Sequence, residues 1–389
     1  MVPHVCPFLK FGAPRSPKMN NMPWAEQLSS GRWRAVYRAP DGRKKSAGTF
    51  PRKTDATFAA HKAAMSNQPA SSAMTWGEWE TQWHAGRTVE KSTRITEESK
   101  LRVHVRPRWG TVPLGQITRD DVQRWVVELG KPVSEGGKGL SPSTVQKLYR
   151  LLSGSLRAAV NADLISRNPC TDISLPRIGP TPDRFLEADE VAAIRAPLEA
   201  DDQFVMDVLV GTGLRWGEAV GLHWEHVDLV RKVISVEWAY SRETGEMKPP
   251  KDHQRRSVPI GDALARELSV RVDESGWGSP APVPYREGRR VRSGLVLAHS
   301  DSRPPDGSNF SKRFEAACRV AWVGKGKARR TVGHVRIHDL RHTYASRLLR
   351  AGVSLEQVSK LLGHASLLTT QRYAHLAQAQ WNQVRDALN

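Results

Sequence analysis

The chain has 389 residues, 39% of them hydrophobic and 25% charged, a balance typical of globular proteins of two or three domains. No run of about 18 apolar residues predicts a membrane span, and the N-terminus lacks the apolar core of a secretory signal, so we expect a cytoplasmic protein. Lys and Arg total 59 against 40 Asp and Glu, a net charge of +19, which favours DNA or RNA as the partner.

Several kinds of site are excluded by motifs that the sequence lacks. Cys6, Cys170 and Cys318 are scattered and form no CxxC pair, which argues against a disulfide framework or a zinc finger. The histidines show no HExxH spacing, and no phosphate-binding GxxxxGK[ST] loop is present. We therefore expect neither a metal nor a cofactor.

Residues 1–70 are predicted to form a small basic domain with a disordered start. They hold 12 Lys and Arg against 3 Asp and Glu, which gives +9 of the +19. In residues 32–38, RWRAVYR, the side chains of Trp33, Ala35 and Tyr37 alternate with Arg32, Arg34 and Val36, as in a half-buried strand. Asp41-Gly42 predicts a hairpin turn, and a helix is expected over residues 54–64. The sheet face would bind nucleic acid, although a solvated polar face is the alternative; the candidate contacts are Arg32, Arg34, Arg38, Arg43, Lys44 and Lys45.

Residues 71–172 are predicted to form an all-helical domain. Trp76, Trp79 and Trp83 recur at helical spacing and are expected in the core. Ser141-Pro142 predicts a helix start, with a serine cap and a proline in the first turn. An apolar stripe follows on that helix, formed by Val145, Leu148, Leu152, Leu156 and Ala159.

A proline-rich linker is expected over residues 173–184, and residues 185–389 are predicted to form a mixed, mainly helical α+β domain. Strands are predicted at Val233–Trp238 and Arg256–Pro259, and a long loop over residues 275–293. The chain ends in a predicted amphipathic helix with Ala377, Trp381, Val384 and Leu388 on one stripe, expected to dock on a neighbouring subunit or on its own domain.

Polar residues inside otherwise apolar helices mark a candidate site in this last domain. Arg215 follows two glycines at a helix start, and Glu218 lies one turn further on. His338 and Arg341 are spaced i, i+3 on one helical face. Taken alone, the Arg215–Glu218 pair is better explained as a surface arginine with an ion-pair partner. The His338–Arg341 spacing alone is a weak signal of a site.

The segment after Arg341 contains clear signals for the starts and ends of helices. Ser354 and Gln357 form a predicted capping box. Gly363 is expected to end that helix, so that His364 projects from its terminus. Ser366 is predicted to cap one more helix, which would carry Tyr373.

The order Arg215, His338-x-x-Arg341, Gly363-His364 and Tyr373 resembles the tyrosine recombinase family, the phage-type site-specific integrases. The resemblance covers the last domain, where the motifs occur in the family's order. The segments LLGHAS and RYAH closely match the family's sequence motifs. It implies an arm-type DNA-binding domain at residues 1–70, a helical core-binding (SAM-like) domain at 71–172 and a catalytic domain at 185–389. It also implies a homotetramer on double-stranded DNA attachment sites in a bacterial host cell. A host DNA-bending factor and an excision directionality factor are candidate further partners.

The resemblance assigns the central reaction to three residues. Tyr373 would attack a DNA phosphodiester, form a 3′-phosphotyrosine and release a 5′-hydroxyl, so that religation proceeds by way of a Holliday junction without ATP. Arg215 and Arg341 would grip the non-bridging oxygens of the transition state with paired donors. Arginines would thus supply the charge that Mg²⁺ provides in other phosphoryl-transfer enzymes.

Supporting roles follow from the same resemblance. His364 would add a donor to the phosphate, His338 would take or steer the tyrosine proton, and Glu218 would orient Arg215. The family also uses a lysine on a β-hairpin loop to protonate the departing 5′-oxygen. The spacing to the SVPI strand favours Lys251 over Lys248 for this role, and phosphate contact alone is the simpler reading of both.

Three other readings remain open at this stage. A type IB topoisomerase uses similar chemistry, but the LLGH motif and the basic N-terminal sheet argue against it. An inactive DNA-binding regulator is less consistent with a full set of occupied positions. A Xer-like chromosome or plasmid dimer resolvase belongs to the same family, but such proteins typically lack the N-terminal domain, so integration and excision of a phage or integrative element is the favoured function.

Overall fold

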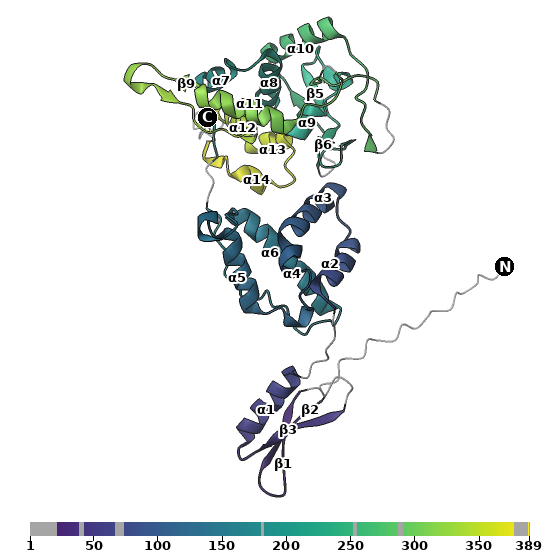
Figure 1. Ribbon diagram of the computed structural model, residues 1–389. Helices are drawn as coiled ribbons and strands as arrows, with labels where there is room; N and C mark the ends of the chain where they lie inside the picture. The colour runs from purple at the N-terminus through teal and green to yellow at the C-terminus, as the bar shows by residue number, and fades with distance from the viewer. Residues whose placement is uncertain are drawn as a thin grey trace, which may run out of the picture. The chain divides into compact units, whose positions relative to one another are not determined.

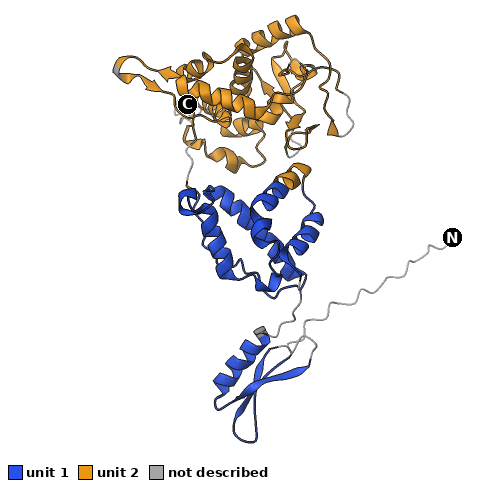
Figure 2. Cartoon of the chain, in the orientation of Figure 1, with its two compact units in different colours: residues 1–89, 97–178 blue, residues 90–96, 179–389 orange. Residues whose placement is uncertain are grey.

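A computed structural model describes residues 22–38, 43–66, 74–179, 183–251, 255–286, 291–299, 301–376 and 388 (Figure 1). The expected disordered start, the turn at Asp41-Gly42 and the terminal stripe from Ala377 to Val384 lie outside these residues. The chain divides into two compact units, one of residues 1–89 and 97–178 and one of residues 90–96 and 179–389 (Figure 2). In the described part of the chain, no helix has both the length and the apolar character to cross a bilayer.

The first unit opens with a three-stranded antiparallel sheet in the order β1-β2-β3. The elements are β1 (Trp24–Gln27), β2 (Trp33–Arg38), β3 (Lys44–Phe50) and α1 (Lys53–Ser66). Helix α1 packs on the sheet through Ala56 and Ala60, which contact Ala35 in a small alanine core. The strand and helix expected here are present, and β1 is an addition that the sequence did not reveal, because its four residues show no clear alternation.

The rest of the first unit is helical. It contains α2 (Trp76–Ala85), α3 (Lys91–Lys100, which begins in the second unit's segment), a π-helical turn Leu101–Val105, α4 (Arg106–Trp109), α5 (Arg119–Gly130), α6 (Pro142–Asn161) and short 3₁₀ turns at Leu114–Gln116 and Val133–Glu135. Ser141 caps α6 as expected, and all five residues of its predicted stripe are buried. Trp76 is fully buried and donates from its indole Nε1 to the Ser155 hydroxyl at 2.8 Å.

The second unit is mainly helical, with small sheets at its margins. Its helices are α7 (Ala188–Arg195), α8 (Ala200–Thr212), α9 (Trp216–Val220), α10 (Asp262–Ser275), α11 (Gly307–Val320), α12 (Ile337–Arg350), α13 (Leu355–Leu362) and α14 (Leu367–Gln371), with 3₁₀ turns at Trp224–His226, Gly326–Ala328 and Ala374–Leu376. Its strands are β4 (Val227–Asp228), β5 (Val233–Val236), β6 (Ala239–Ser241), β7 (Glu246–Lys248), β8 (Arg256–Pro259), β9 (Trp322–Val323) and β10 (Arg330–Thr331).

The antiparallel pairing of these strands explains where the predicted ones end. Strand β5 lies between β4 and β8, with Ile234 opposite Val258 and both side chains fully buried. The strand expected through Trp238 stops at Val236, because the chain then leaves this sheet and pairs in a separate hairpin, β6 with β7. Helix α12 packs against α8 and α13 in the core, and together these elements position the candidate site.

The multidomain fold class is confirmed: a small sheet with a helix, an all-helical region and a mixed, mainly helical region follow one another. The finer division at residues 70, 172 and 184 stays a prediction.

Candidate active site

The loop between α8 and α9 places Arg215. Gly213 ends α8 in the left-handed conformation, with φ +63°, which glycine adopts without strain. A Cβ atom at this position would lie only 2.3 Å from the Tyr344 ring, so the site needs glycine for space as well. Two residues later, Arg215 is the N-cap of the short helix α9, at the helix start that the sequence predicts.

Glu218 fixes the Arg215 side chain, as expected. The guanidinium donates from Nη1 to Glu218 Oε1 at 2.8 Å and from Nη2 to the Gly363 carbonyl at 2.8 Å. Glu218 Oε2 also accepts from the Arg215 backbone N–H at 2.9 Å. The Arg215 side chain remains 30% exposed, so this guanidinium is held from one side and open on the other.

Arg341 lies deeper than Arg215 and is held by backbone carbonyls. It donates from Nη1 to the Gly213 carbonyl at 2.7 Å and from Nη2 to the Leu362 carbonyl at 2.5 Å. Burial, together with the nearby charge of Arg215, lowers the pKa of Arg341 to about 9. The residue lines a cavity of about 720 Å³ whose other walls include Trp216, Tyr240, Arg242 and His338.

The two expected histidines come from two segments, the first turn of α12 and the short stretch after α13. His338, in the first turn of α12, lines the same cavity as Arg341. His364 follows Gly363, which ends α13 with φ +63° as the sequence predicts. The His364 Nδ1 hydrogen-bonds with the Thr370 hydroxyl at 2.7 Å, which leaves Nε2 to act on a ligand. Desolvation and neighbouring groups lower the pKa of each ring to about 4, so both are neutral at physiological pH.

Tyr373 differs from its predicted setting in one respect. Helix α14 begins at the Ser366 cap but ends at Gln371, so Tyr373 lies two residues beyond it rather than on the helix. The chain tightens there, with the Tyr373 N–H donating to the Thr370 carbonyl at 2.9 Å, and a 3₁₀ turn follows at once. The side chain is 2% exposed and packs edge-on against Phe185.

The Tyr373 hydroxyl hydrogen-bonds with Nδ1 of His342 and not with His338. His342 is itself buried, and its Nε2 lies 3.7 Å from Asp183 Oδ1. Burial and the nearby Asp183 carboxylate raise the pKa of Tyr373 to about 12, so the phenol is protonated at neutral pH. The nucleophile candidate is thus neutral and enclosed. Its hydroxyl contacts His342, which lies one turn along α12 from His338, the histidine expected to assist it.

The two candidate lysines lie in different environments. Lys248 ends β7, and its Nζ lies 3.4 Å from Glu90 Oε1, in the N-terminal segment of the same compact unit. Lys251 lies in the turn after β7, and its side chain is exposed, with no partner among the residues that the structure describes. Lys251 is therefore the more exposed of the two lysines, and its role as the proton donor stays a prediction.

Two buried residues of the site were missed by the sequence analysis. Arg256, on β8, hydrogen-bonds with Glu218, and His342 holds Tyr373. His342 directly follows Arg341, and Arg256 lies in the predicted strand Arg256–Pro259. Their partners lie 38 and 31 residues away along the chain, so no local pattern gave a signal for either contact.

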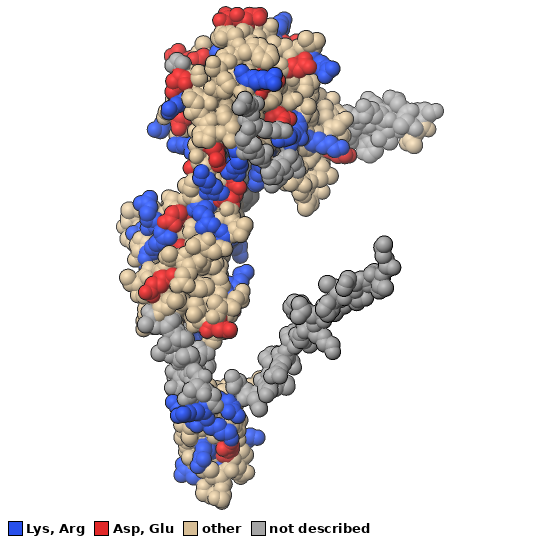
Figure 3. Space-filling model, turned by 90° about the vertical axis from the view of Figure 1, so that its right-hand side faces the viewer, with Lys and Arg blue, Asp and Glu red and all other residues tan. Residues whose placement is uncertain are grey.

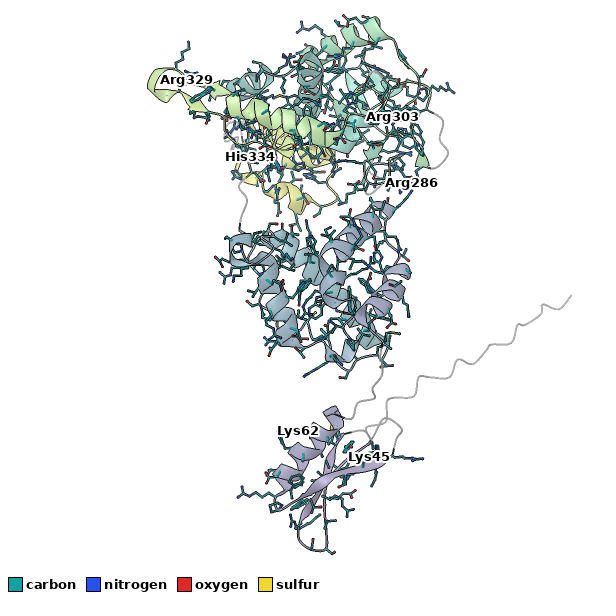
Figure 4. The ribbon with its side chains drawn as sticks, in the orientation of Figure 1. Lys45, Lys62, Arg286, Arg303, Arg329 and His334 are labelled. Carbon is teal, nitrogen blue, oxygen red and sulfur yellow. The ribbon has the colours of Figure 1, made fainter. Side chains whose placement is uncertain are left out.

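The predicted DNA-binding residues of the N-terminal sheet lie on its exposed parts. Strand alternation and pairing put Arg34, Arg38 and Lys44 on the face opposite the alanine core, and Lys44 contacts Glu26 at 3.3 Å. Arg32, Arg43 and Lys45 are exposed at the strand ends. Figure 3 shows several Lys and Arg side chains on the visible face of this small domain, with little Asp or Glu among them. Figure 4 shows Lys45 on the strands and Lys62 on α1.

A family model identifies this arrangement. Residues 183–380 match the model of the phage integrase family, a span that contains every candidate catalytic residue described above. The chain belongs to the phage integrase family, the tyrosine recombinases. It is accordingly a site-specific DNA recombinase.

Relatives of this recombinase are found among bacterial proteins. It is 28% identical over 260 residues to the tyrosine recombinase XerC of Xylella fastidiosa, covering 65% of this chain and 77% of the relative. It is 32% identical over 255 residues to XerD of Pseudomonas aeruginosa, covering 62% of this chain and 74% of the relative.

Solved structures share its fold. The Tn1549 transposon integrase in complex with a circular intermediate DNA matches with a TM-score of 0.61 at 21% identity, over 81% of this chain and 99% of that chain. A lambda integrase dimer bound to a COC′ core site matches with a TM-score of 0.58 at 19% identity, over 94% of this chain and 98% of that chain.

Proposed function

We propose that this recombinase integrates and excises a phage or other mobile element by cutting and rejoining DNA at attachment sites. The observation that carries the proposal is the meeting of Arg215 and Arg341 at the end of α13, with His338 and His364 beside them. Two guanidiniums and neutral histidine donors suit an oxyanion that develops on phosphorus.

The proposed cleavage step is a balanced transesterification. The Tyr373 oxygen attacks phosphorus while its proton passes to the neutral ring of His338. The bond to the 5′-oxygen breaks, and that oxygen takes a proton from Lys251. The phosphodiester is kept as a phosphotyrosine, so that attack by another 5′-hydroxyl reverses the step and rejoins the strand.

Before this attack, Tyr373 has to leave its enclosed position. Its hydroxyl now faces His342, and the two rings of His342 and His338 stand edge to face with their centroids 4.7 Å apart. A shift of the short segment after α14 would carry the phenol from one histidine toward the other. We propose that DNA binding triggers this shift, because the arginines attract the negatively charged scissile phosphate into the site.

The N-terminal sheet supports an integrase over a resolvase. Its basic face suits phosphate contacts, and a two-stranded ribbon fits the major groove. We propose that it binds arm-type sites apart from the cleavage core. The similarity to XerC and XerD favours the second candidate, a chromosome or plasmid dimer resolvase. In a resolvase, removing the sheet would leave all DNA footprints unchanged.

The proposed assembly is a homotetramer on two attachment sites. A lambda integrase tetramer bound to a Holliday junction shares the fold, with a TM-score of 0.57 at 20% identity. A host DNA-bending factor and a directionality factor for excision are further proposed partners, since arm and core sites on one duplex have to be brought together.

The nucleophile assignment gives the direct test. The protein is mixed with a nicked duplex from the element–chromosome junction beside its gene, and covalent DNA is measured after denaturation in SDS. Tyr373→Phe should abolish the adduct and leave DNA binding nearly intact, because only the hydroxyl is lost. Tyr149→Phe is the matched control, a tyrosine that hydrogen-bonds to the Cys170 carbonyl in the other unit. An adduct that survives in Tyr373→Phe would falsify the assignment.

A further inference from the structure

A third arginine lies behind the two that face the proposed phosphate site. Arg256 begins β8, and its side chain is only 7% exposed. It donates from Nη2 to Glu218 Oε2 at 2.6 Å, from Nη1 to Glu218 Oε1 at 3.2 Å and from Nε to the Leu361 carbonyl at 2.6 Å. All three of its nitrogens are thus engaged with protein, so it is not arranged to bind DNA itself.

Three arginines meet three successive carbonyl groups at the end of α13. Arg256 donates to Leu361, Arg341 to Leu362 and Arg215 to Gly363. The last carbonyls of a helix lack intrahelical partners and carry the negative end of its dipole. One helix end therefore sets the spacing of all three guanidiniums.

Gly363 makes this close approach possible. A Cβ atom there would lie 3.0 Å from Arg256 Nη1 and 3.2 Å from its Cζ, so the guanidinium lies directly against the glycine backbone. The left-handed φ of +63° at Gly363 independently requires glycine. Arg256 is therefore packed as part of the turn that leads to His364.

The charges around Glu218 show what Arg256 contributes. The Glu218 carboxylate is 2% exposed and lies between Arg215 and Arg256. Burial alone would raise the pKa of Glu218, but the bonds from Arg256 and Arg215 hold it below its usual value. The three guanidiniums and the one carboxylate together carry a net charge of about +2. Without Arg256, the charge of Glu218 would offset that of Arg215, and the cluster would carry a net charge of about +1.

We infer that Arg256 is a positioning residue for strand cleavage: it balances the charge of Glu218 and fixes its carboxylate, so that the positive charge of Arg215 is not offset and Arg215 keeps its orientation for the phosphate. This inference rests on the proposed function. It assigns no contact with DNA to Arg256, whose effect passes through Glu218 and the end of α13.

The test compares Arg256→Met with Arg313→Met. Arg313 makes an equivalent two-bond pair with the buried Asp202 elsewhere in the same unit, so it reports the general cost of losing such a pair. Adduct formation is measured in a single turnover on the nicked duplex. We expect Arg256→Met to be slower by about tenfold to a hundredfold, the range found when groups that orient metal ligands are lost, and Arg313→Met to match wild type.

A second duplex separates positioning from a loss of stability. In it the scissile phosphate is replaced by a methylphosphonate, which removes the charge from the non-bridging oxygens. A guanidinium clamp matters less when that charge is absent, so the defect of Arg256→Met should shrink to a few-fold. A general weakening of the fold would slow both duplexes equally, and equal defects on the two would overturn the inference.

A double variant gives a rescue arm. In Glu218→Gln/Arg256→Met the carboxylate is gone as well, so Arg215 is no longer neutralised, and cleavage should be faster than in Arg256→Met alone. Failure of this rescue, or wild-type cleavage by Arg256→Met, counts against the inference. If wild type forms no adduct, or Tyr373→Phe still forms it, the proposed function fails instead.

Discussion

The arginines of the N-terminal sheet expose their guanidinium groups to solvent, whereas those around the end of α13 hold theirs against backbone carbonyls. Arg34 and Arg32 are exposed on and beside β2, whereas Arg341 is 3% exposed and donates to two backbone carbonyls. An exposed guanidinium attracts phosphates in a way that salt screens. A buried, oriented one stabilises charge at a single place. The first setting suits affinity and the second suits reaction rate, and this difference can be tested.

The largest effect is expected at the buried arginine. Arg341→Lys keeps a positive charge but loses the planar fork that reaches Gly213 and Leu362 together. We expect adduct formation to fall by about two to three orders of magnitude, as for other lost oxyanion donors, with little change in the dissociation constant for DNA. The measurement is single-turnover cleavage beside a binding titration. If Arg341→Lys cleaves within a few-fold of the wild-type rate, the buried arginine has no special role in catalysis.

Removing the whole basic sheet should change which DNA sites are occupied. Deletion of residues 1–70 is expected to erase footprints at flanking arm sites, because the sheet carries their proposed contacts. Cleavage of a short core duplex should persist, since every candidate catalytic residue lies beyond residue 210. Footprinting of the full-length and truncated proteins on one attachment-site fragment checks this. Identical footprints would favour the resolvase alternative.

The pH dependence of cleavage tests the protonation states within the site. His338 has a pKa near 4 and Tyr373 a pKa near 12, so a neutral base and a neutral phenol coexist between these values. The rate of adduct formation should therefore be nearly flat from pH 6 to 8. It should fall as the pH drops toward 4 and His338 is protonated, and again above about 9, where Arg341 loses its proton. A tenfold rise per pH unit across the range would instead indicate prior ionisation of Tyr373.

The smallest effect is expected for a single exposed arginine. Arg34→Ala should weaken binding of the arm-site DNA modestly and lower the slope of log affinity against log salt by about one, the value for one lost phosphate contact. Cleavage of the core duplex should be unaffected. Thr49→Ala, on the strand opposite Arg34, is the control for the sheet. An unchanged salt slope in Arg34→Ala would mean that this side chain makes no phosphate contact.

The parts of the site that were predictable are those that local chemistry determines. Ser354 and Gln357 form the capping box, Gly363 has the left-handed conformation, and Arg215 begins α9, each as expected from neighbours within four residues. Tyr373 was placed on a helix because the Ser366 cap signals a start, but nothing in the sequence marks the end at Gln371.

What was missed depends on contacts between distant segments. Arg256 meets Glu218 only because β8 pairs with β5 and faces α13 in the folded unit. His342 directly follows Arg341, but its contact with Tyr373 depends on how the chain turns after α14. Strand β1 is too short for its alternation to be recognised, and its pairing with β2 defines it.

The carbonyl groups at the end of α13 have a consequence for how this enzyme can change over evolutionary time. A side-chain acceptor can be lost by a single codon change, but a peptide oxygen is present whatever residue occupies the position. Leu361 and Leu362 can thus drift among residues of similar volume while their acceptors persist, provided that the helix still terminates at the same place. Insertion or deletion of one residue in α13 would instead displace every acceptor together. Selection here acts on helix length, which a search for invariant side chains does not detect.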